Sequence, residues 1–408
     1  MLSHRVNRLT AGLALAGCTH LAHAAGFALI EQNASGLGNA YAGAAAVAED
    51  ASTVYYNPAG MSLLPDRQIV VVGHLIKPRM EFSGTVSPAV GGGQGGDAGS
   101  WAFVPNAYFA YRLTPDVHVG LGLNSPFGLK TEYDSDWIGR YQAIKSEVTT
   151  VNLNPSIAYK LSSQFSVGAG LNVQYFETEL TNSAGAAGLA TVKGDDYGWG
   201  FNLGALWQLG PGTRLGLAYR SEIDYDLEGS ASFSGMPALN GDVTAETITP
   251  DSASLSLFHK LGPRWDLLAD VSWTGWSDFD KLAIYRTSGA LLSYTPQNWN
   301  DTWRYSLGAT WHMDDAWSFR GGIAYDEAPV SDNGRTPRIP DGARTWVALG
   351  GQYRTGKRGA IDFGYAHLFV DDVSLNSPTP GTIPTSPRLN GDYDSAVDVL
   401  SAQYTHSF

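Results

Sequence analysis

The chain is poor in cysteine, in long hydrophobic runs and in positive charge. Its one cysteine, Cys18, lies within residues 1–24, so a chain that loses this segment has neither disulfide bonds nor thiol chemistry. Beyond residue 24, no stretch approaches the ~20 consecutive apolar residues that a membrane-spanning helix needs. The formal net charge is −13, and it becomes −15 if Arg5 and Arg8 are removed. This balance argues against a nucleic-acid partner.

Residues 1–24 have the pattern of a secretory signal peptide. Arg5 and Arg8 form a short basic region, residues 9–17 are apolar, and Ala22-His23-Ala24 is a small-residue cleavage site. An alternative stays open, because Leu15-Ala16-Gly17-Cys18 also has the form of a lipoprotein cleavage box, in which Cys18 would be acylated. Either reading predicts export.

The rest of the chain is rich in aromatic residues and glycine, with 12 Trp, 20 Tyr and 48 Gly. Its last residues alternate strictly: one parity is apolar, and the other carries Ser395, Ser401, Gln403, Thr405 and Ser407. A strand places these two sets on opposite faces. The apolar set ends on Tyr404 and the terminal Phe408. This ending resembles the closing strand of bacterial outer-membrane barrels, which implies the barrel assembly machinery as a partner.

The spacing of turns predicts an all-β fold, a 14-stranded antiparallel transmembrane β-barrel over residues 67–408. Short turns alternate with long Gly/Ser/Asp-rich loops, and an even strand number leaves both chain ends on the periplasmic side. A soluble solenoid or sandwich is the alternative fold. The expected strands cover 69–82, 101–113, 117–124, 146–160, 165–180, 194–209, 213–230, 247–260, 264–287, 300–312, 316–325, 342–354, 359–373 and 391–408.

Alternation within these strands predicts which side chains face the lumen. In 264–274 and 300–312, Trp and Leu share one parity and charged residues the other. A cation on the lipid face near the bilayer midplane would cost about 2–4 kcal/mol, so the charges should point inward. Six aromatic residues near strand ends should form girdles at the membrane surfaces: Trp265, Trp303, Trp311, Trp317, Tyr325 and Trp346.

Eight charged residues should pair across the lumen or hold a plug, with Asp50 and Asn57 on the plug side: Arg214, Arg220, Arg304, Arg320, Asp266, Asp270, Asp362 and Asp398.

Residues 25–66 are the expected plug. They lack strand alternation and are rich in Gly and Ala, and a barrel of this size leaves an open aqueous lumen unless something fills it. We therefore predict that residues 25–66 form an N-terminal hatch inside the barrel.

The hatch and a later segment carry a family resemblance. Ala25-Gly26-Phe27, Ser35 to Gly43, Glu49 to Ser52 and the motif Asn57-Pro58-Ala59 resemble the hatch of the FadL family, and residues 319–330 and 338–346 support the match. This family comprises outer-membrane transporters of long-chain fatty acids and other hydrophobic compounds. The resemblance implies passive transport, no enzymatic activity, no cofactor or metal, and an N-terminus tucked beside the ligand. It therefore favours cleavage after Ala24 and makes Phe27 a candidate ligand contact.

The third predicted strand is interrupted by Ser125-Pro126-Phe127-Gly128. Pro126 cannot donate to a strand ladder, and Gly128 can adopt bent geometry. From the local sequence alone, these residues could also simply begin the following loop. In the FadL family the matching strand kinks inward, so the resemblance implies a lateral exit through the barrel wall. An apolar cargo would then pass directly into lipid instead of water.

The ligand itself is less well indicated. The resemblance implies basic residues near the carboxylate of a fatty acid, but two of the matching positions are Asn182 and Ala283. Lys281 is the candidate substitute. Because basic residues are missing at 182 and 283, neutral aromatic hydrocarbons stay open as the cargo. A general porin and a phospholipase centred on His312 are further alternatives for the function. The expected partners are a hydrophobic small molecule, the outer-membrane lipid and lipopolysaccharide, with no nucleic acid.

Overall fold

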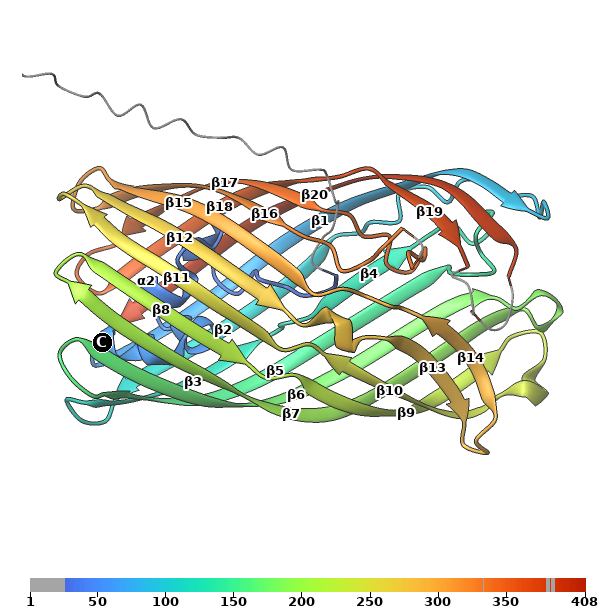
Figure 1. The fold of residues 1–408 in the computed structure, drawn as a ribbon, viewed down its shortest axis with the longest axis horizontal. Helices are drawn as coiled ribbons and strands as arrows, with labels where there is room; N and C mark the ends of the chain where they lie inside the picture. The colour runs from blue at the N-terminus through green and yellow to red at the C-terminus, as the bar shows by residue number, and fades with distance from the viewer. Residues whose placement is uncertain (1–25, 333, 379–381, 383–385) are drawn as a thin grey trace, which may run out of the picture.

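The computed structural model describes residues 26–332, 334–378, 382 and 386–408. Its strands form a closed antiparallel barrel of 14 strands, seen from the side in Figure 1. The fold class expected from the sequence is confirmed. The cleavage site and the acylation site considered above lie outside the described residues.

Several of the wall-spanning strands consist of two consecutive elements, such as β3 and β4. The strands are β1 (Arg67–Ser87), β2 (Ala102–Arg112), β3 (Val117–Asn124), β4 (Gly128–Glu132), β5 (Lys145–Lys160), β6 (Phe165–Ser183), β7 (Leu189–Gly210), β8 (Thr213–Arg220), β9 (Ile223–Phe233), β10 (Gly241–Thr249), β11 (Ser252–Leu261), β12 (Trp265–Thr274), β13 (Lys281–Arg286), β14 (Leu291–Pro296), β15 (Thr302–His312), β16 (Trp317–Asp326), β17 (Arg344–Arg354), β18 (Gly359–Val370), β19 (Val373–Ser377) and β20 (Arg388–Ser407).

The barrel closes where its first and last strands meet. β1 pairs antiparallel with β20, from Gln68 opposite Ser407 to Ser87 opposite Arg388. The C-terminus lies at the end of the barrel that carries the short turns (Figure 1). This is the end expected to face the periplasm.

The predicted alternation holds around the wall, with two corrections. Trp303, Tyr305 and Leu307 are exposed on the outer face of β15, whereas Arg304 and Ser306 are buried inside. Trp346, expected in a girdle, is instead fully buried, because it stands on the inward parity of β17. Asp398, expected in the lumen, has the parity of the exposed Leu400. Its carboxylate accepts hydrogen bonds from Tyr365 and His367 on the outward side of β18.

Four strands predicted to be continuous are broken. The spans 213–230, 247–260, 264–287 and 359–373 are interrupted at 221–222, 250–251, 275–280 and 371–372, and β14 adds a strand within an expected loop. The buried set changes parity across the first two breaks: Leu217 of β8 is exposed, whereas Tyr225 of β9 is buried. Each part alternates regularly by itself, so alternation over short windows does not detect the break. The third break contains the short 3₁₀ helix η4 (Trp276–Asp278).

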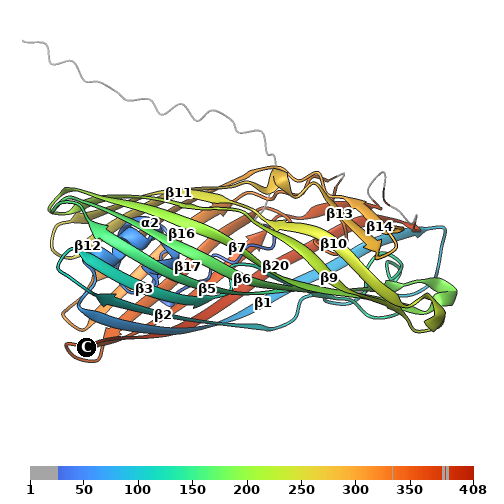
Figure 2. The same ribbon diagram turned by 90° about the horizontal axis from the view of Figure 1, so that it is seen from below.

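The residues before β1 occupy the lumen, and we call residues 26–66 the hatch. They form α1 (Ala34–Leu37), α2 (Ala44–Val47), α3 (Thr53–Tyr56) and the 3₁₀ helix η1 (Pro58–Leu63). Both views of the barrel place this segment inside the ring of strands (Figures 1 and 2). α1 packs on β17, β18 and β20, and α2 packs on β8 and β11. None of the helices among the described residues is long and apolar enough to cross a membrane. The remaining 3₁₀ helices, η2 (Gly185–Ala187) and η3 (Pro237–Leu239), lie in loops.

Candidate functional site: the cavity between hatch and wall

Phe27 is enclosed by aromatic side chains. It is 4% exposed, and its ring centroid lies 4.8 Å from that of Trp276, 5.9 Å from Phe279 and 6.0 Å from Trp299. The ring of Phe127 lies 5.8 Å away. All four contacts are edge-to-face, which is a favourable arrangement for aromatic pairs.

This aromatic cage depends on the strand breaks. Trp276 and Phe279 come from the break between β12 and β13, and Trp299 comes from the connection between β14 and β15. Gly26 has φ of +64°, and a Cβ there would lie 2.8 Å from Trp276 and 2.9 Å from Trp299. Only glycine fits both this backbone conformation and this space. The backbone nitrogen of Gly26 donates to Asp341 Oδ2 at 2.7 Å, which fixes the start of the hatch.

The wall opens where β3 gives way to β4. β2 pairs with β3 only as far as Ala107 opposite Leu123, whereas β5 pairs with both β3 and β4. In the described chain, residues 102–106 of β2 have a strand partner only on the β1 side. The four residues Ser125 to Gly128 therefore mark a gap between β2 and β4.

The start of the hatch pairs antiparallel with the kink, through a bridge between Ala28 and Phe127. The backbone nitrogen of Leu29 donates to the carbonyl of Pro126 at 2.8 Å, and that of Gly128 donates to the carbonyl of Phe27 at 2.9 Å. Gly128 does not act as a bent hinge, because it belongs to β4. A Cβ there would instead lie 3.0 Å from Leu29 Cδ1, so the glycine allows the hatch to approach closely.

Polar side chains satisfy the backbone of the kink. Thr150 Oγ1 accepts from the Phe127 nitrogen at 3.1 Å and donates to the Phe127 carbonyl at 2.7 Å. Gln32 of the hatch donates to the Ser125 carbonyl at 3.0 Å, and Asn106 accepts from the Ser125 nitrogen at 3.3 Å. Because buried backbone groups are costly when unpaired, these contacts make the kink a stable feature of the wall.

A cavity of about 680 Å³ lies between the hatch and this part of the wall. Its lining includes Phe27, Leu29 and Phe127 inside the barrel, and Trp101 and Phe103 on the outer face. Trp101 is 61% exposed and Phe103 is 65% exposed. The cavity therefore reaches from the aromatic cage through the gap to the surface that would face lipid.

The inner end of the cavity is polar. Glu31, Arg220, Arg304 and Arg344 line it. Arg344 Nη2 lies 2.8 Å from Asp341 Oδ1, and Arg304 stands on β15 directly opposite Asp326 of β16. Burial raises the pKa of the Glu31 carboxyl, although Arg344 and Arg304 lie near enough to oppose this shift.

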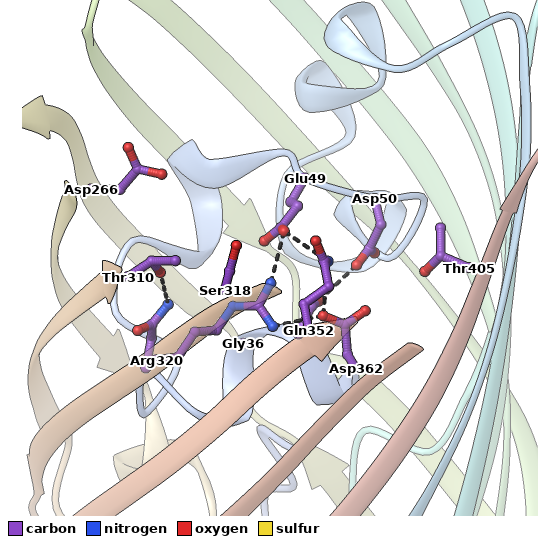
Figure 3. Close-up of polar contacts among 12 residues, drawn as sticks. Gly36, Glu49, Asp50, Asp266, Thr310, Ser318, Arg320, Gln352, Asp362 and Thr405 are labelled. Carbon is purple, nitrogen blue, oxygen red and sulfur yellow. Dashed lines mark hydrogen bonds and ion pairs between the residues drawn. The ribbon is translucent and has the colours of Figure 1, made fainter. Parts of the chain in front are cut away.

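An ion-pair network holds the hatch to the wall, with its wall residues Arg320 and Asp362 buried (Figure 3). Arg320 Nη1 lies 2.6 Å from Asp362 Oδ1, and Arg320 Nη2 lies 2.7 Å from Glu49 Oε1 of the hatch. Gln352 donates to both carboxylates, at 3.1 Å to Glu49 and 2.9 Å to Asp362. The expectation that lumenal charges pin the hatch holds for Arg320 and Asp362, with Glu49 as the hatch partner. Asp50 instead accepts hydrogen bonds from Ser35, Ser52 and Gln403.

The motif Asn57-Pro58-Ala59 anchors the hatch through Asn57. Its side-chain oxygen accepts from the Ala59 nitrogen at 3.1 Å and thereby caps η1, with Pro58 in the first turn. Its side-chain nitrogen donates to the carbonyls of Ala45 at 2.7 Å and Ala205 at 3.0 Å. One asparagine thus joins two hatch helices to β7, which accounts for the motif in structural terms.

Two other candidate residues lie away from the cavity. Lys281 stands at the start of β13 with its side chain 47% exposed, and its Nζ lies 3.6 Å from Asp280; the cavity lining does not include it. His312 contacts Asp266 at 2.7 Å and Ser318 at 2.9 Å, also outside the lining. The structure therefore brings together Phe27 and the kink residues, and it leaves Lys281 apart.

Comparison with known proteins places the chain in a family. Residues 15–408 match the family described as outer membrane protein transport protein (OMPP1/FadL/TodX). The long-chain fatty acid transport protein of Escherichia coli K12 is 30% identical over 403 residues, covering 87% of this chain and 90% of the relative. The 47 kDa outer membrane protein of Pasteurella multocida is 34% identical over 388 residues, with 87% and 90% covered.

Solved structures show the same architecture. A Pseudomonas aeruginosa FadL homologue superimposes with a TM-score of 0.88 at 26% identity, covering 94% of this chain and 100% of the homologue. The toluene transporter TodX of Pseudomonas putida gives a TM-score of 0.70 at 20% identity, covering 94% and 99%. At that identity the second match speaks for the fold alone.

Proposed function

Because the chain belongs to the OMPP1/FadL/TodX family of outer-membrane transport proteins, we propose that it carries long-chain fatty acids inward and releases them sideways through the gap at Ser125 to Gly128. The family consists of transport proteins, and the expectation that the chain is not an enzyme is confirmed. Its place in the bacterial outer membrane is likewise supported by the family and the closed barrel. The barrel assembly machinery, outer-membrane lipid and lipopolysaccharide stay predicted partners.

One observation carries the proposal: a single cavity joins the caged Phe27 to the outward-facing Trp101 and Phe103. An acyl chain gains ~0.8 kcal/mol per CH₂ on leaving water, so an exit into lipid is downhill, whereas an exit into the periplasm is not. The direct path along the barrel axis is filled by the hatch, which Arg320 and Asn57 hold in place. Transport by this route needs no energy source.

Neutral aromatic hydrocarbons are the second candidate cargo. Lys281 lies outside the cavity lining, and the residues at 182 and 283 are Asn and Ala, so none of these positions offers a cation to a carboxylate in the cavity. A general porin fits less well, because the lumen contains the hatch. Competition between hexadecanoic acid and toluene for the purified protein separates the two cargoes.

The gap can be tested by closing it chemically. Cys18 is the only cysteine and lies within the predicted signal peptide, so Leu129→Cys introduces a unique thiol into the processed chain. Leu129 lines the cavity beside the kink. Labelling with a bulky lipid-soluble maleimide should abolish uptake of hexadecanoic acid by cells that carry normal amounts of the barrel.

Leu349→Cys is the matched control, because Leu349 is exposed on the outer face of β17 away from the gap. Labelling there should leave uptake unchanged. Undiminished uptake by the labelled Leu129→Cys protein would show that cargo leaves elsewhere, most simply past the hatch.

A further inference from the structure

Arg220 is an isolated cation at the inner end of the cavity. It is the last residue of β8 and lines the cavity from inside the barrel. Among the described residues, it has no carboxylate within 4.0 Å, in contrast to Arg344, which pairs with Asp341. A charge removed from water without a counter-ion is unfavourable, so such an arrangement needs an explanation.

The groups that surround Arg220 are neutral hydrogen-bond acceptors. One guanidinium nitrogen donates to Asn172 Oδ1, and the other donates to the Tyr55 carbonyl of the hatch at 3.0 Å. The guanidinium carbon lies 4.3 Å from the centre of the Tyr55 ring. These contacts orient the side chain and leave its positive charge uncompensated.

A chain of amides joins this cation to the exit. Asn152 Nδ2 donates to Asn172 Oδ1 at 3.1 Å and to Asn124 Oδ1 at 3.0 Å. Asn124 is the last residue of β3, directly before the kink. This amide chain lies behind the cavity lining, which contains Arg220 and Asn124 but neither Asn152 nor Asn172. The walls of the cavity are apolar, with residues such as Leu29, Phe127 and Leu129.

We propose that Arg220 is an anion subsite, which binds the carboxylate of an amphipathic ligand while the acyl chain lies against the apolar wall. An Arg–carboxylate contact is charge-assisted and can be bidentate. Arg304 is a poorer candidate because Asp326 stands opposite it on β16 and Glu31 lies in the same part of the cavity. The inference rests on the proposed transport function and specifies the class of ligand: a long-chain acid, in preference to a neutral hydrocarbon.

The test compares an acid with its alcohol. Purified full-length protein is titrated with hexadecanoic acid and with hexadecan-1-ol at a pH at which the acid is ionised. Wild-type protein should bind the acid more tightly. Arg220→Gln should weaken acid binding by about tenfold or more, and should change alcohol binding by less than about twofold. Arg220→Lys keeps the charge and should retain the preference for the acid.

Arg214→Gln is the control. Arg214 stands on the same strand and the same inward face, stacks on Phe258 at 4.2 Å, and lies outside the cavity lining. The Arg214→Gln protein should bind both the acid and the alcohol as the wild-type protein does. Equal losses for acid and alcohol in Arg220→Gln, or no loss of acid binding, would overturn the subsite.

The wild-type measurement needs no variant, and an acid that binds no more tightly than the alcohol would also overturn the subsite. If wild-type protein binds neither of these ligands nor toluene, the transport proposal itself fails. The two failures are therefore distinguishable.

Discussion

Phe27 connects the hatch, the wall and the cavity at the scale of one residue. Its ring fills a cage whose members come from three separate wall connections, and its carbonyl accepts from Gly128 at the kink. Movement of this residue would open the cage toward the cavity and also remove a strand partner from β4. Through its ring and its carbonyl, this one residue therefore connects the cage to the proposed exit.

Replacing Phe27 with glutamate should disturb both roles. A carboxylate among four aromatic rings would be desolvated at a cost of several kcal/mol. Because each ~1.4 kcal/mol is a factor of ten, the introduced glutamate side chain would rarely occupy the cage. We expect uptake of hexadecanoic acid to fall at least about tenfold, while the amount of folded barrel in the membrane is unchanged. Phe27→Leu, which stays apolar, should retain most of the uptake. Normal uptake by an inserted Phe27→Glu barrel would remove Phe27 from the mechanism.

At the scale of the element, the kink between β3 and β4 departs from a regular barrel strand. Pro126 explains why a ladder contact is missing, but side chains outside the kink keep its backbone satisfied. Thr150 is the central one, because its hydroxyl group pairs with both the nitrogen and the carbonyl of Phe127. The shape of the gap is thus decided by β5 as much as by the kinked strand.

Thr150→Val removes this hydroxyl group and nearly preserves the volume of the side chain. Two buried backbone groups of Phe127 lose their partner, and we expect a loss of about 1–3 kcal/mol in the free energy of unfolding. Denaturant titration of the purified barrel in micelles, followed by tryptophan fluorescence, measures this change. Thr150→Ser keeps the hydroxyl group and should show most of the wild-type stability. Equal stability of the valine and serine variants would mean that the kink does not depend on Thr150.

The whole molecule is a pore that is closed by its own N-terminal segment. Arg320 joins Glu49 of the hatch to Asp362 of β18, and Asn57 joins η1 to β7. β1 and β20 pair directly with each other along their length, and the hatch packs on them from inside. The barrel should therefore assemble without the hatch, and the hatch should control what passes through.

Deletion of residues 25–66, with the signal peptide retained, tests this division of labour. Conductance across a planar bilayer should rise from near background to that of a water-filled pore, because a lumen of this width is open when empty. Resistance of the deleted barrel to unfolding in cold detergent checks that the wall has formed. A protein that worked as a general porin would show little change in conductance on deletion.

The sequence by itself determined the parts of this protein that depend on local periodicity. Alternation over short windows identified the wall, because successive side chains of a strand face opposite sides whatever surrounds them. The lack of alternation before residue 67 and the glycine-rich pattern there indicated the hatch, and Pro126 marked the kink. The family resemblance added the expectation that Phe27 lies near the ligand.

Only the tertiary structure decided which residues meet in the cavity. Trp276 and Trp299 reach Phe27 from connections between strands, across sequence separations that no local pattern encodes. The pairing of Arg320 with Glu49, the outward position of Lys281 and the isolation of Arg220 each follow from barrel closure around the hatch. Side chains on β8, β15 and β17 become neighbours of hatch residues because the wall curves back on itself. The burial that makes their charges matter exists only once the barrel is closed.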